Sequence, residues 1–401
     1  MAIPYILAYL FAVYPLKSYG NLDRFSLELD YDSAVIVLDG QTVKLTLDSG
    51  SPGWYVMSGD AYEKKHGKGS CKGLADGCYF CTKSAPCDDI LDKKPKTTSY
   101  YDEDCFHYVD HVAALSLGDL TIPGMKFGLI VEACSPVRGE APKGVLGLSL
   151  GEEDTFINQL RTFRVINETS YTVDMAPLTS QKKGSVFLGH SKEDVAELNR
   201  INLTRRPDLE YLTTHRSSLY LFGHDGNSLI HGHTRDIHLH EEDPMNVLID
   251  TGTTSIDLTI NEYYRFCDVL KAKSPTSTEE AAFIDERGAV WVQLWAFRHL
   301  PTLGFDFVDG PNGFPFPVRI RPGDYLRTCY STQCMLDILV VQEDRPLYCM
   351  GHPFFRAYYT YINLETMMMY LSMEPRKPAP STRQRRKRPQ DMALIWKVRI
   401  W

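Results

Sequence analysis

The feature that most constrains the fold of this chain is a short motif that occurs once in each half of the sequence. Residues 247–249 form an apolar run that ends at Asp250, and residues 43–47 alternate apolar and polar side chains up to Asp48. After each aspartate the chain turns on a glycine between two hydroxyl residues. Polar turns after strands are common, so one copy says little. Two copies about half a chain apart predict two lobes with one aspartate each.

Two carboxyl groups that share a site cannot both ionise cheaply, so the pair holds one proton over a range of acidic pH. The ionised member can take a proton from water while the protonated member polarises an amide carbonyl, which hydrolyses a peptide without a covalent intermediate. This chemistry needs neither metal nor cofactor, and we expect none. The predicted catalytic residues are Asp48 and Asp250, and the predicted supporting residues are Ser49, Gly50, Ser51, Thr251, Gly252 and Thr253.

Local patterns predict mostly β-structure around these motifs. Asp39-Gly40 is typical of a hairpin turn that leads into the Asp48 strand. Residues 261–272 are predicted to be helical, and residues 154–160 are predicted to form a helix with Asp154 as its N-cap.

Several features together indicate the secretory pathway. The 401 residues include ten cysteines and two N-x-[ST] glycosylation sequons, at Asn167 and Asn202. Residues 3–16 contain an apolar run that is short for a membrane span, so residues 1–20 are interpreted as a signal peptide. No other segment is long and apolar enough for a transmembrane helix. We therefore expect a secreted or lysosomal protein without an integral membrane span.

The net charge of −8 hides an asymmetry between the body of the chain and its end. Residues 375–401 carry nine Lys or Arg against one acid, so the body is strongly acidic and nucleic acid is not expected as a partner. The tail is predicted to be disordered. Residues 383–388 also resemble a convertase cleavage site, and the apolar, basic residues 393–401 are expected to fray rather than lie on a membrane.

The cysteines and histidines leave alternatives open. Residues 58–96 read as a disulfide-stapled surface insertion, and the competing interpretation is zinc binding at Cys78-x-x-Cys81. Five histidines in residues 224–240 suggest either a metal site or an exposed hairpin, and the hairpin is favoured because metal ligands must converge. The candidates for disulfide bonding are Cys71, Cys78, Cys81, Cys87, Cys105, Cys134, Cys267, Cys329, Cys334 and Cys349.

Taken together, these motifs resemble the pepsin-type, bilobal eukaryotic aspartic proteases from about residue 29 to residue 372. The two Asp-containing loops resemble the family's catalytic loops, and residues 144–147 and 349–351 resemble the elements that brace them. Proton sharing between two aspartates is the known chemistry of this class. The resemblance implies an all-β fold with a few short helices. It also implies two β-barrel-like lobes, residues 21–178 and 179–374, with a cleft between them that binds peptide, in a monomeric endopeptidase active at acidic pH.

The sequence also departs from the family pattern. Counting back from Gly118 places Tyr101 at the tyrosine of the flap over the substrate, with Tyr100 as a rival for this role. Residues 102–107 are acidic and bulky where relatives have small residues. Trp54 follows Asp48 by six residues, one fewer than is common, and His352 stands where an acid is common. A second-lobe cysteine is absent near residues 290–294, so Cys267 is expected to pair with Cys329 or Cys334.

No basic prosegment fits between the signal peptide and the first strand. We therefore expect either that no activation step is needed or that the sequence is an incomplete precursor. The altered flap and this missing segment support an alternative hypothesis, a catalytically weak or inactive pepsin-fold protein that binds peptides or another protein in the cleft. The two aspartates and their glycines favour the enzyme.

Overall fold

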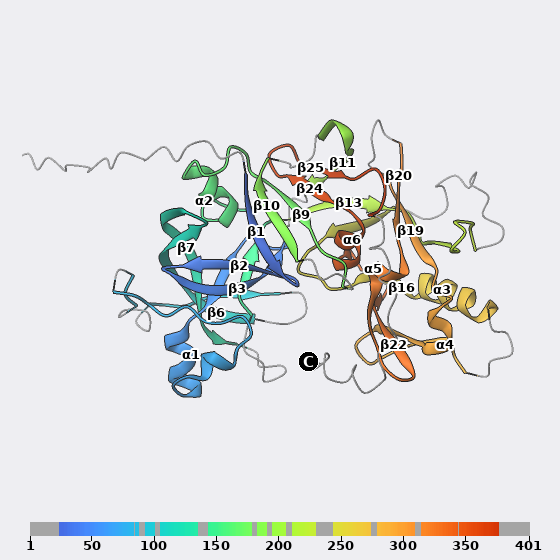
Figure 1. Cartoon of the computed structure of the whole chain (residues 1–401), viewed down its shortest axis with the longest axis horizontal. Helices are drawn as coiled ribbons and strands as arrows, with labels where there is room; N and C mark the ends of the chain where they lie inside the picture. Colours follow the sequence, from blue (N-terminus) through green and yellow to red (C-terminus); the bar gives the residue numbers. More distant parts are fainter. Residues whose placement is uncertain are drawn as a thin grey trace, which may run out of the picture.

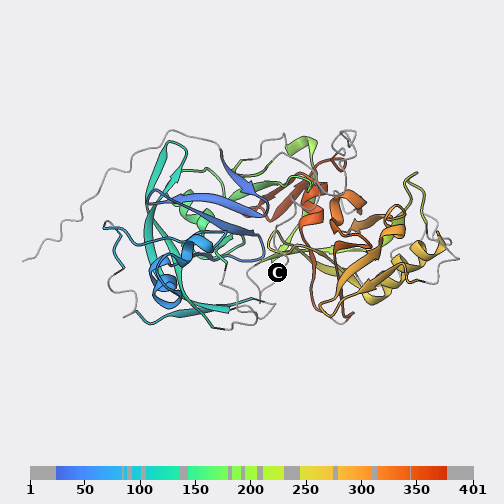
Figure 2. The same cartoon turned by 60° about the horizontal axis from the view of Figure 1, so that its bottom comes forward.

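The computed structural model contains two β-rich lobes that lie side by side (Figure 1). A turned view shows the same arrangement, with the blue-to-green N-terminal lobe next to the yellow-to-orange C-terminal lobe (Figure 2). The structure describes residues 24–83, 85–87, 93–100, 105–134, 143–178, 183–190, 195–205, 211–229, 244–273, 279–308, 314–343 and 345–376. The predicted signal peptide, Tyr101, four of the five histidines in residues 224–240, and the tail beyond Arg376 lie outside these residues.

The first sheet contains 13 strands of the described chain in the order β11-β25-β24-β9-β10-β1-β2-β3-β8-β4-β7-β6-β5. Its strands are β1 (Arg24–Asp30), β2 (Ser33–Leu38), β3 (Gln41–Asp48), β4 (Trp54–Met57), β5 (Lys96–Ser99), β6 (Cys105–Leu117), β7 (Leu120–Ala133), β8 (Val145–Gly147), β9 (Ser170–Asp174), β10 (Gly184–Gly189), β11 (Asn199–Asn202), β24 (Thr360–Asn363) and β25 (Met368–Leu371).

The second sheet contains 12 strands of the described chain, nine of them in the order β14-β19-β13-β15-β23-β16-β22-β18-β17. Its strands are β12 (Thr204–Arg205), β13 (Leu212–Arg216), β14 (Tyr220–Phe222), β15 (Met245–Ile249), β16 (Ile256–Thr259), β17 (Ala282–Ile284), β18 (Ala289–Gln293), β19 (Thr302–Phe307), β20 (Phe316–Ile320), β21 (Leu326–Cys329), β22 (Gln333–Val341) and β23 (Tyr348–Met350). Strands β12, β20 and β21 pair with β13, β19 and β22.

The helices in the described residues are short and lie between strands. They are α1 (Gly59–His66), α2 (Phe156–Thr162), α3 (Ile260–Ala272), α4 (Leu294–Phe297), α5 (Pro322–Tyr325) and α6 (His352–Ala357), with 3-10 turns η1 (Ser70–Gly73) and η2 (Val195–Glu197). The predicted helix at residues 261–272 is confirmed as α3. The helix predicted from Asp154 begins two residues later, because the side chain of Thr155 caps it by accepting from the Asn158 N–H.

The predicted hairpin before the first aspartate is confirmed. Asp39 and Gly40 both have positive φ, 47° and 77°, which the mirror-image turns of tight hairpins require. Strands β2 and β3 pair antiparallel on either side of this turn. Along β3 the residues Val43, Leu45 and Leu47 are buried while Lys44 and Thr46 between them are partly exposed, so the alternating pattern places one face on the core.

The two lobes share one continuous sheet. Strand β9 of the N-terminal lobe pairs with β24, which comes from the C-terminal end of the chain, and β24 in turn pairs with β25 (Figure 1). Buried side chains follow this seam, including Tyr171, Ile201, Ile362 and Leu371. The interface between the lobes is therefore a hydrophobic core as well as a hydrogen-bonded ladder, which holds the two aspartate loops in register.

All ten cysteines lie in the described residues, and eight form disulfides: Cys71–Cys78, Cys81–Cys87, Cys105–Cys134 and Cys329–Cys334. The first two support the prediction of a disulfide-stapled insertion, and they divide the Cys78-x-x-Cys81 pair between different bridges. Cys81, Cys87 and His111 have possible metal-ligand atoms within 4.8 Å of one another, but the disulfide leaves only the histidine as a ligand.

The prediction that Cys267 pairs with Cys329 or Cys334 is wrong. Cys329 and Cys334 lie opposite each other on the antiparallel strands β21 and β22 and bond to one another. Cys267 on α3 is a free thiol beside Tyr263, and Cys349 is also free. The local hairpin of β21 and β22 therefore pairs Cys329 with Cys334 and leaves Cys267 without a disulfide.

In the described residues, no helix has the length and apolar character needed to cross a membrane.

A buried ion pair joins the second sheet to its longest helix. Arg216 on β13 is fully buried, and its guanidinium donates to both carboxylate oxygens of Glu262 on α3, at 2.7 and 2.9 Å. Glu262 also accepts from the backbone N–H of Leu219 and Thr259. Burial raises the pKa of Glu262, but the charge and hydrogen bonds of Arg216 outweigh it and leave that pKa below its ordinary value.

We expect Arg216→Met to lower the free energy of unfolding of the C-terminal lobe by about 3 to 5 kcal/mol, because it leaves the Glu262 charge buried and unpaired. Urea denaturation followed by tryptophan fluorescence measures this change. The matched control is Lys96→Met, which breaks the exposed pair of Lys96 and Asp110 and is expected to cost less than about 1 kcal/mol. Equal losses in the two variants would contradict the prediction.

Candidate active site

Each predicted catalytic aspartate lies where a central strand meets a turn. Asp48 is the last residue of β3, and Asp250 directly follows β15. A short strand runs parallel to each of these, β8 beside β3 and β23 beside β15. The two lobes therefore build their aspartate loops with the same local arrangement, as the repeated motif predicts.

A glycine braces each loop by close backbone contact. A Cβ atom on Gly147 would lie 2.2 Å from the Gly53 carbonyl oxygen, and one on Gly351 would lie 2.0 Å from that of Thr253. Both distances are far below van der Waals contact, so only glycine fits. These close contacts are consistent with the resemblance of residues 144–147 and 349–351 to the family elements that brace the two aspartate loops.

The structure brings the carboxyl groups of Asp48 and Asp250 together. The Gly50 N–H donates to Asp48 Oδ1 at 2.8 Å and to Asp250 Oδ1 at 3.2 Å, so one amide contacts both carboxyl groups. The Gly252 N–H donates to Asp250 Oδ1 at 2.8 Å, and Thr253 Oγ1 donates to Asp250 Oδ2 at 2.7 Å. Ser51 also contacts Asp48, through its backbone N–H.

The pair is arranged to share a proton. Burial raises the pKa of Asp48 well above its ordinary value, and the charge of Asp250 and a hydrogen bond between the two carboxyl groups raise it further. Hydrogen bonds from Gly50 and Ser51 oppose this shift without cancelling it. Asp48 therefore stays protonated into a pH range where an exposed aspartate is ionised, which gives the site an acid and a base at once.

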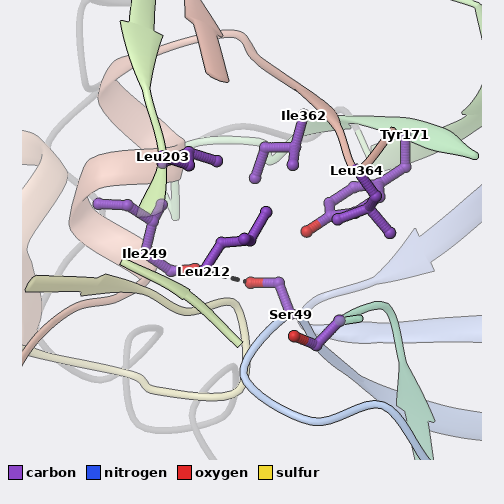
Figure 3. A pocket seen from close by; sticks show the side chains of 8 residues that line it. Ser49, Tyr171, Leu203, Leu212, Ile249, Ile362 and Leu364 are labelled. Atoms are coloured by element: carbon purple, nitrogen blue, oxygen red, sulfur yellow. Dashed lines mark hydrogen bonds between the residues drawn. The ribbon is translucent and has the colours of Figure 1, made fainter. Parts of the chain in front are cut away.

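Reciprocal hydrogen bonds tie the two loops together. The Ser49 N–H donates to Thr251 Oγ1 at 2.9 Å, and the Thr251 N–H donates to Ser49 Oγ at 3.0 Å. Ser49 Oγ also donates to the Ile249 carbonyl at 2.9 Å (Figure 3). All three bonds join residues about 200 positions apart in the chain, so the distance between the two carboxyl groups depends on the approach of the lobes.

Behind these bonds lies a small cavity of about 10 Å³, lined by residues from both lobes that include Ser49, Tyr171, Ile249 and Ile362 (Figure 3). The space is about that of one water molecule. Tyr171 is buried on β9 and hydrogen-bonds Ser49, and burial raises the pKa of this phenol well above its ordinary value. The sequence does not single out Tyr171, because it lies far from both aspartate loops along the chain.

The hairpin of β5 and β6 carries the predicted flap, whose tip with Tyr101 lies outside the described residues. Trp54 is buried against Phe127 and Phe156 and faces the core. Tyr55, seven residues after Asp48, packs on Phe106 and Tyr108 of β6 instead. Tyr55 therefore contacts the hairpin through β6, which the sequence did not indicate.

The remaining predicted positions that the structure describes are the two sequons and one histidine. Asn167 and Asn202 are both exposed, on the connection before β9 and at the end of β11, which suits glycosylation sequons. His224, the histidine of the predicted cluster that is described, is exposed and contacts the Arg298 carbonyl oxygen at 3.3 Å.

Two β lobes that present paired aspartate loops at their contact define a bilobal aspartic-protease type of fold. The sequence matches the family model of the eukaryotic aspartyl proteases over residues 33–373, and the chain belongs to this family. The structure is also similar to the crystal structure of aspartic proteinase from Irpex lacteus, with a TM-score of 0.61 and 14% identity over 88% of this chain and 97% of that one. Among curated proteins, none matches the sequence. The predicted family and fold class are confirmed.

The raised pKa of Asp48 predicts a pH-dependent effect of Asp48→Asn on stability. The ordinary aspartate pKa is about 3.9, and above it the unfolded chain loses the proton of Asp48 more readily than the folded chain does. Folded stability therefore falls as the pH rises, whereas an asparagine at this position does not titrate and causes no such loss. We expect wild type and variant to have similar Tm values near or below about pH 3.9, and the variant to be more stable by a few degrees near neutral pH. Calorimetric scans across this range test it, with the exposed Asp268→Asn as control. Parallel Tm profiles for Asp48→Asn and wild type would rule the prediction out.

Proposed function

We propose that this protein is an aspartic endopeptidase in which Asp48 and Asp250 are the catalytic pair. The observation that carries the proposal is the contact of both carboxyl groups with one amide, Gly50 N–H, together with the raised pKa of Asp48. A site without this contact would hold two independent aspartates, each ionised above about pH 4. The shared proton is what peptide hydrolysis by a bound water requires.

In the proposed reaction the ionised carboxylate accepts a proton from a water molecule held between the two aspartates. The protonated carboxyl group donates to the oxygen of the scissile carbonyl, and the pair then returns a proton to the leaving amine. Gly50, Gly252 and Thr253 hold the carboxyl oxygens in place through the hydrogen bonds described above. Ser49 and Thr251 keep the loops at one separation, and Ser51 supports Asp48.

The finer parts of the proposal concern substrate, pH and compartment. We propose that the protein cleaves between apolar residues. Cleavage is proposed at acidic pH, because the aspartate pair holds one proton in that range. Tyr101 of the flap is proposed to lie over the substrate. The four disulfides and the exposed Asn167 and Asn202 support passage through the secretory pathway to the outside or to a lysosome. The proposed lobes are residues 21–178 and 179–374, after a signal peptide at 1–20 and before a basic tail at 375–401.

We expect Asp250→Asn to reduce peptidase activity by at least about 10²-fold, because the pair loses its base. The measurement is cleavage of a denatured protein substrate between about pH 3 and 6, a range around the upper pKa of such pairs. Asp268→Asn, which changes an exposed carboxylate on α3, is the matched control and should cleave like wild type.

Two outcomes would contradict the proposal. Absence of cleavage by the wild type across the whole pH range would leave the endopeptidase function without support and favour a peptide-binding role. Cleavage that persists in Asp250→Asn would show that another site carries the activity.

A further inference from the structure

His352 directly supports the second aspartate loop. It is the first residue of α6 and is buried, with 2% of its surface exposed. Helix α6 lies near the centre of the molecule (Figure 1). Its Nε2 atom lies 2.9 Å from the Thr251 carbonyl oxygen, and its backbone N–H donates to the Thr253 carbonyl at 3.0 Å. One residue therefore holds the loop on both sides of Gly252.

The partner of the ring shows which nitrogen carries the proton. A carbonyl oxygen only accepts hydrogen bonds, so Nε2 must be the donor and the neutral ring has its lone pair on Nδ1. Thr251 is also the residue whose N–H and Oγ1 bond to Ser49 of the other lobe. The His352 bond thus fixes the same peptide segment that sets the distance between the two aspartates.

The surroundings of His352 oppose a positive charge on the ring. Burial lowers the pKa of His352, and the positive charge of Arg356, also on α6, lowers it further. Asp32 in the turn between β1 and β2, Asp337 on β22 and the hydrogen bond to the Thr251 carbonyl raise this pKa, without cancelling the two effects that lower it. The Asp337 carboxylate is already engaged, since it pairs with Arg356 at 2.7 Å and with Arg327 at 3.6 Å.

We propose that His352 is a positioning residue whose neutral imidazole holds the Asp250 loop, and that its protonation sets the lower pH limit of the folded, working site. This inference rests on the proposed function for its catalytic part. Proton linkage gives the direction in which folded stability changes with pH. In the unfolded chain a histidine takes up a proton below about pH 6.5, while the folded site resists it, so folded stability falls as the pH drops through this range. The loss continues until the pH reaches the lowered pKa of the folded state.

The loss of folded stability at low pH is expected to affect the Asp250 loop before the rest of the fold. A proton on Nδ1 places a second buried positive charge beside Arg356, and the site relieves this repulsion by moving the start of α6 or admitting water. Either change pulls on the carbonyl oxygens of Thr251 and Thr253, both of which His352 contacts. A protein with two carboxylates suited to acid would then work best in weak rather than strong acid.

The test compares His352→Gln with His352→Leu in the full chain. Glutamine places an N–H donor near the position of Nε2 but does not titrate, whereas leucine removes the donor. The matched control is His224→Gln, since His224 also contacts a backbone carbonyl through Nε2 but is exposed. Tm is measured by calorimetry from about pH 7 to about pH 4, on both sides of the ordinary histidine pKa. Cleavage of a denatured substrate is measured over the same range.

The expected result is a fall in Tm with acidification that is smaller in His352→Gln than in wild type by about 2 °C or more. His224→Gln should follow wild type, and His352→Leu should have a lower Tm than His352→Gln at every pH. The ratio of cleavage at about pH 4 to that at about pH 6 should be higher in His352→Gln than in wild type, mainly through kcat, because the substrate-binding surface is unchanged.

Two results would overturn the inference. If wild type and His352→Gln have parallel Tm profiles, His352 does not titrate as proposed. If His352→Leu is as stable as His352→Gln, the bond to Thr251 does not position the loop. Both tests use Tm alone, so they are decisive even if no variant cleaves substrate. Absence of cleavage would count against the endopeptidase function and not against the role of His352.

Discussion

The two reciprocal hydrogen bonds between Ser49 and Thr251 are the contact on which the rest of the site depends. Each loop alone would hold its aspartate in a polar turn and could not share a proton. Once the hydroxyl of each loop accepts from the backbone of the other, the carboxyl groups are forced into one small volume and the pKa of Asp48 rises. The sheet shared by β9 and β24, and the buried side chains along it, maintain the lobe contact that these bonds require.

Buried ionisable groups have different kinds of partner in different parts of the structure. Arg216 and Glu262 form a two-bond pair whose charges satisfy one another, and this pair connects β13 to α3. Asp48 and Asp250 lie buried against one another, and burial together with the charge of Asp250 raises the pKa of Asp48. His352 is buried beside Arg356 and is held neutral. The Arg216–Glu262 charges thus neutralise one another in the C-terminal lobe, while the two aspartates of like charge lie at the site where proton transfer is proposed.

Features that depend on a few neighbouring residues could be predicted from the sequence. Asp39-Gly40 adopts the two positive φ values that its turn requires, and residues 261–272 carry the apolar period of α3. Predictions failed or stayed incomplete where residues distant in the chain decide. Cys267 could be assigned a partner only by knowing which strands are adjacent, and β21 pairs with β22. The N-cap of α2 is Thr155 rather than the predicted Asp154, so the helix begins at Phe156.

The sequence by itself determined the two strand-turn motifs, the family and the mostly β fold, because alternating burial and glycine turns are encoded by nearest neighbours. It identified Asp48 and Asp250 without showing that they meet. Only the tertiary structure decided that one amide contacts both carboxyl groups, that Tyr171 and His352 reach the loops, and that Tyr55 rather than Trp54 faces the hairpin. The physical reason is that pKa shifts and loop contacts depend on burial and on distances between residues hundreds of positions apart.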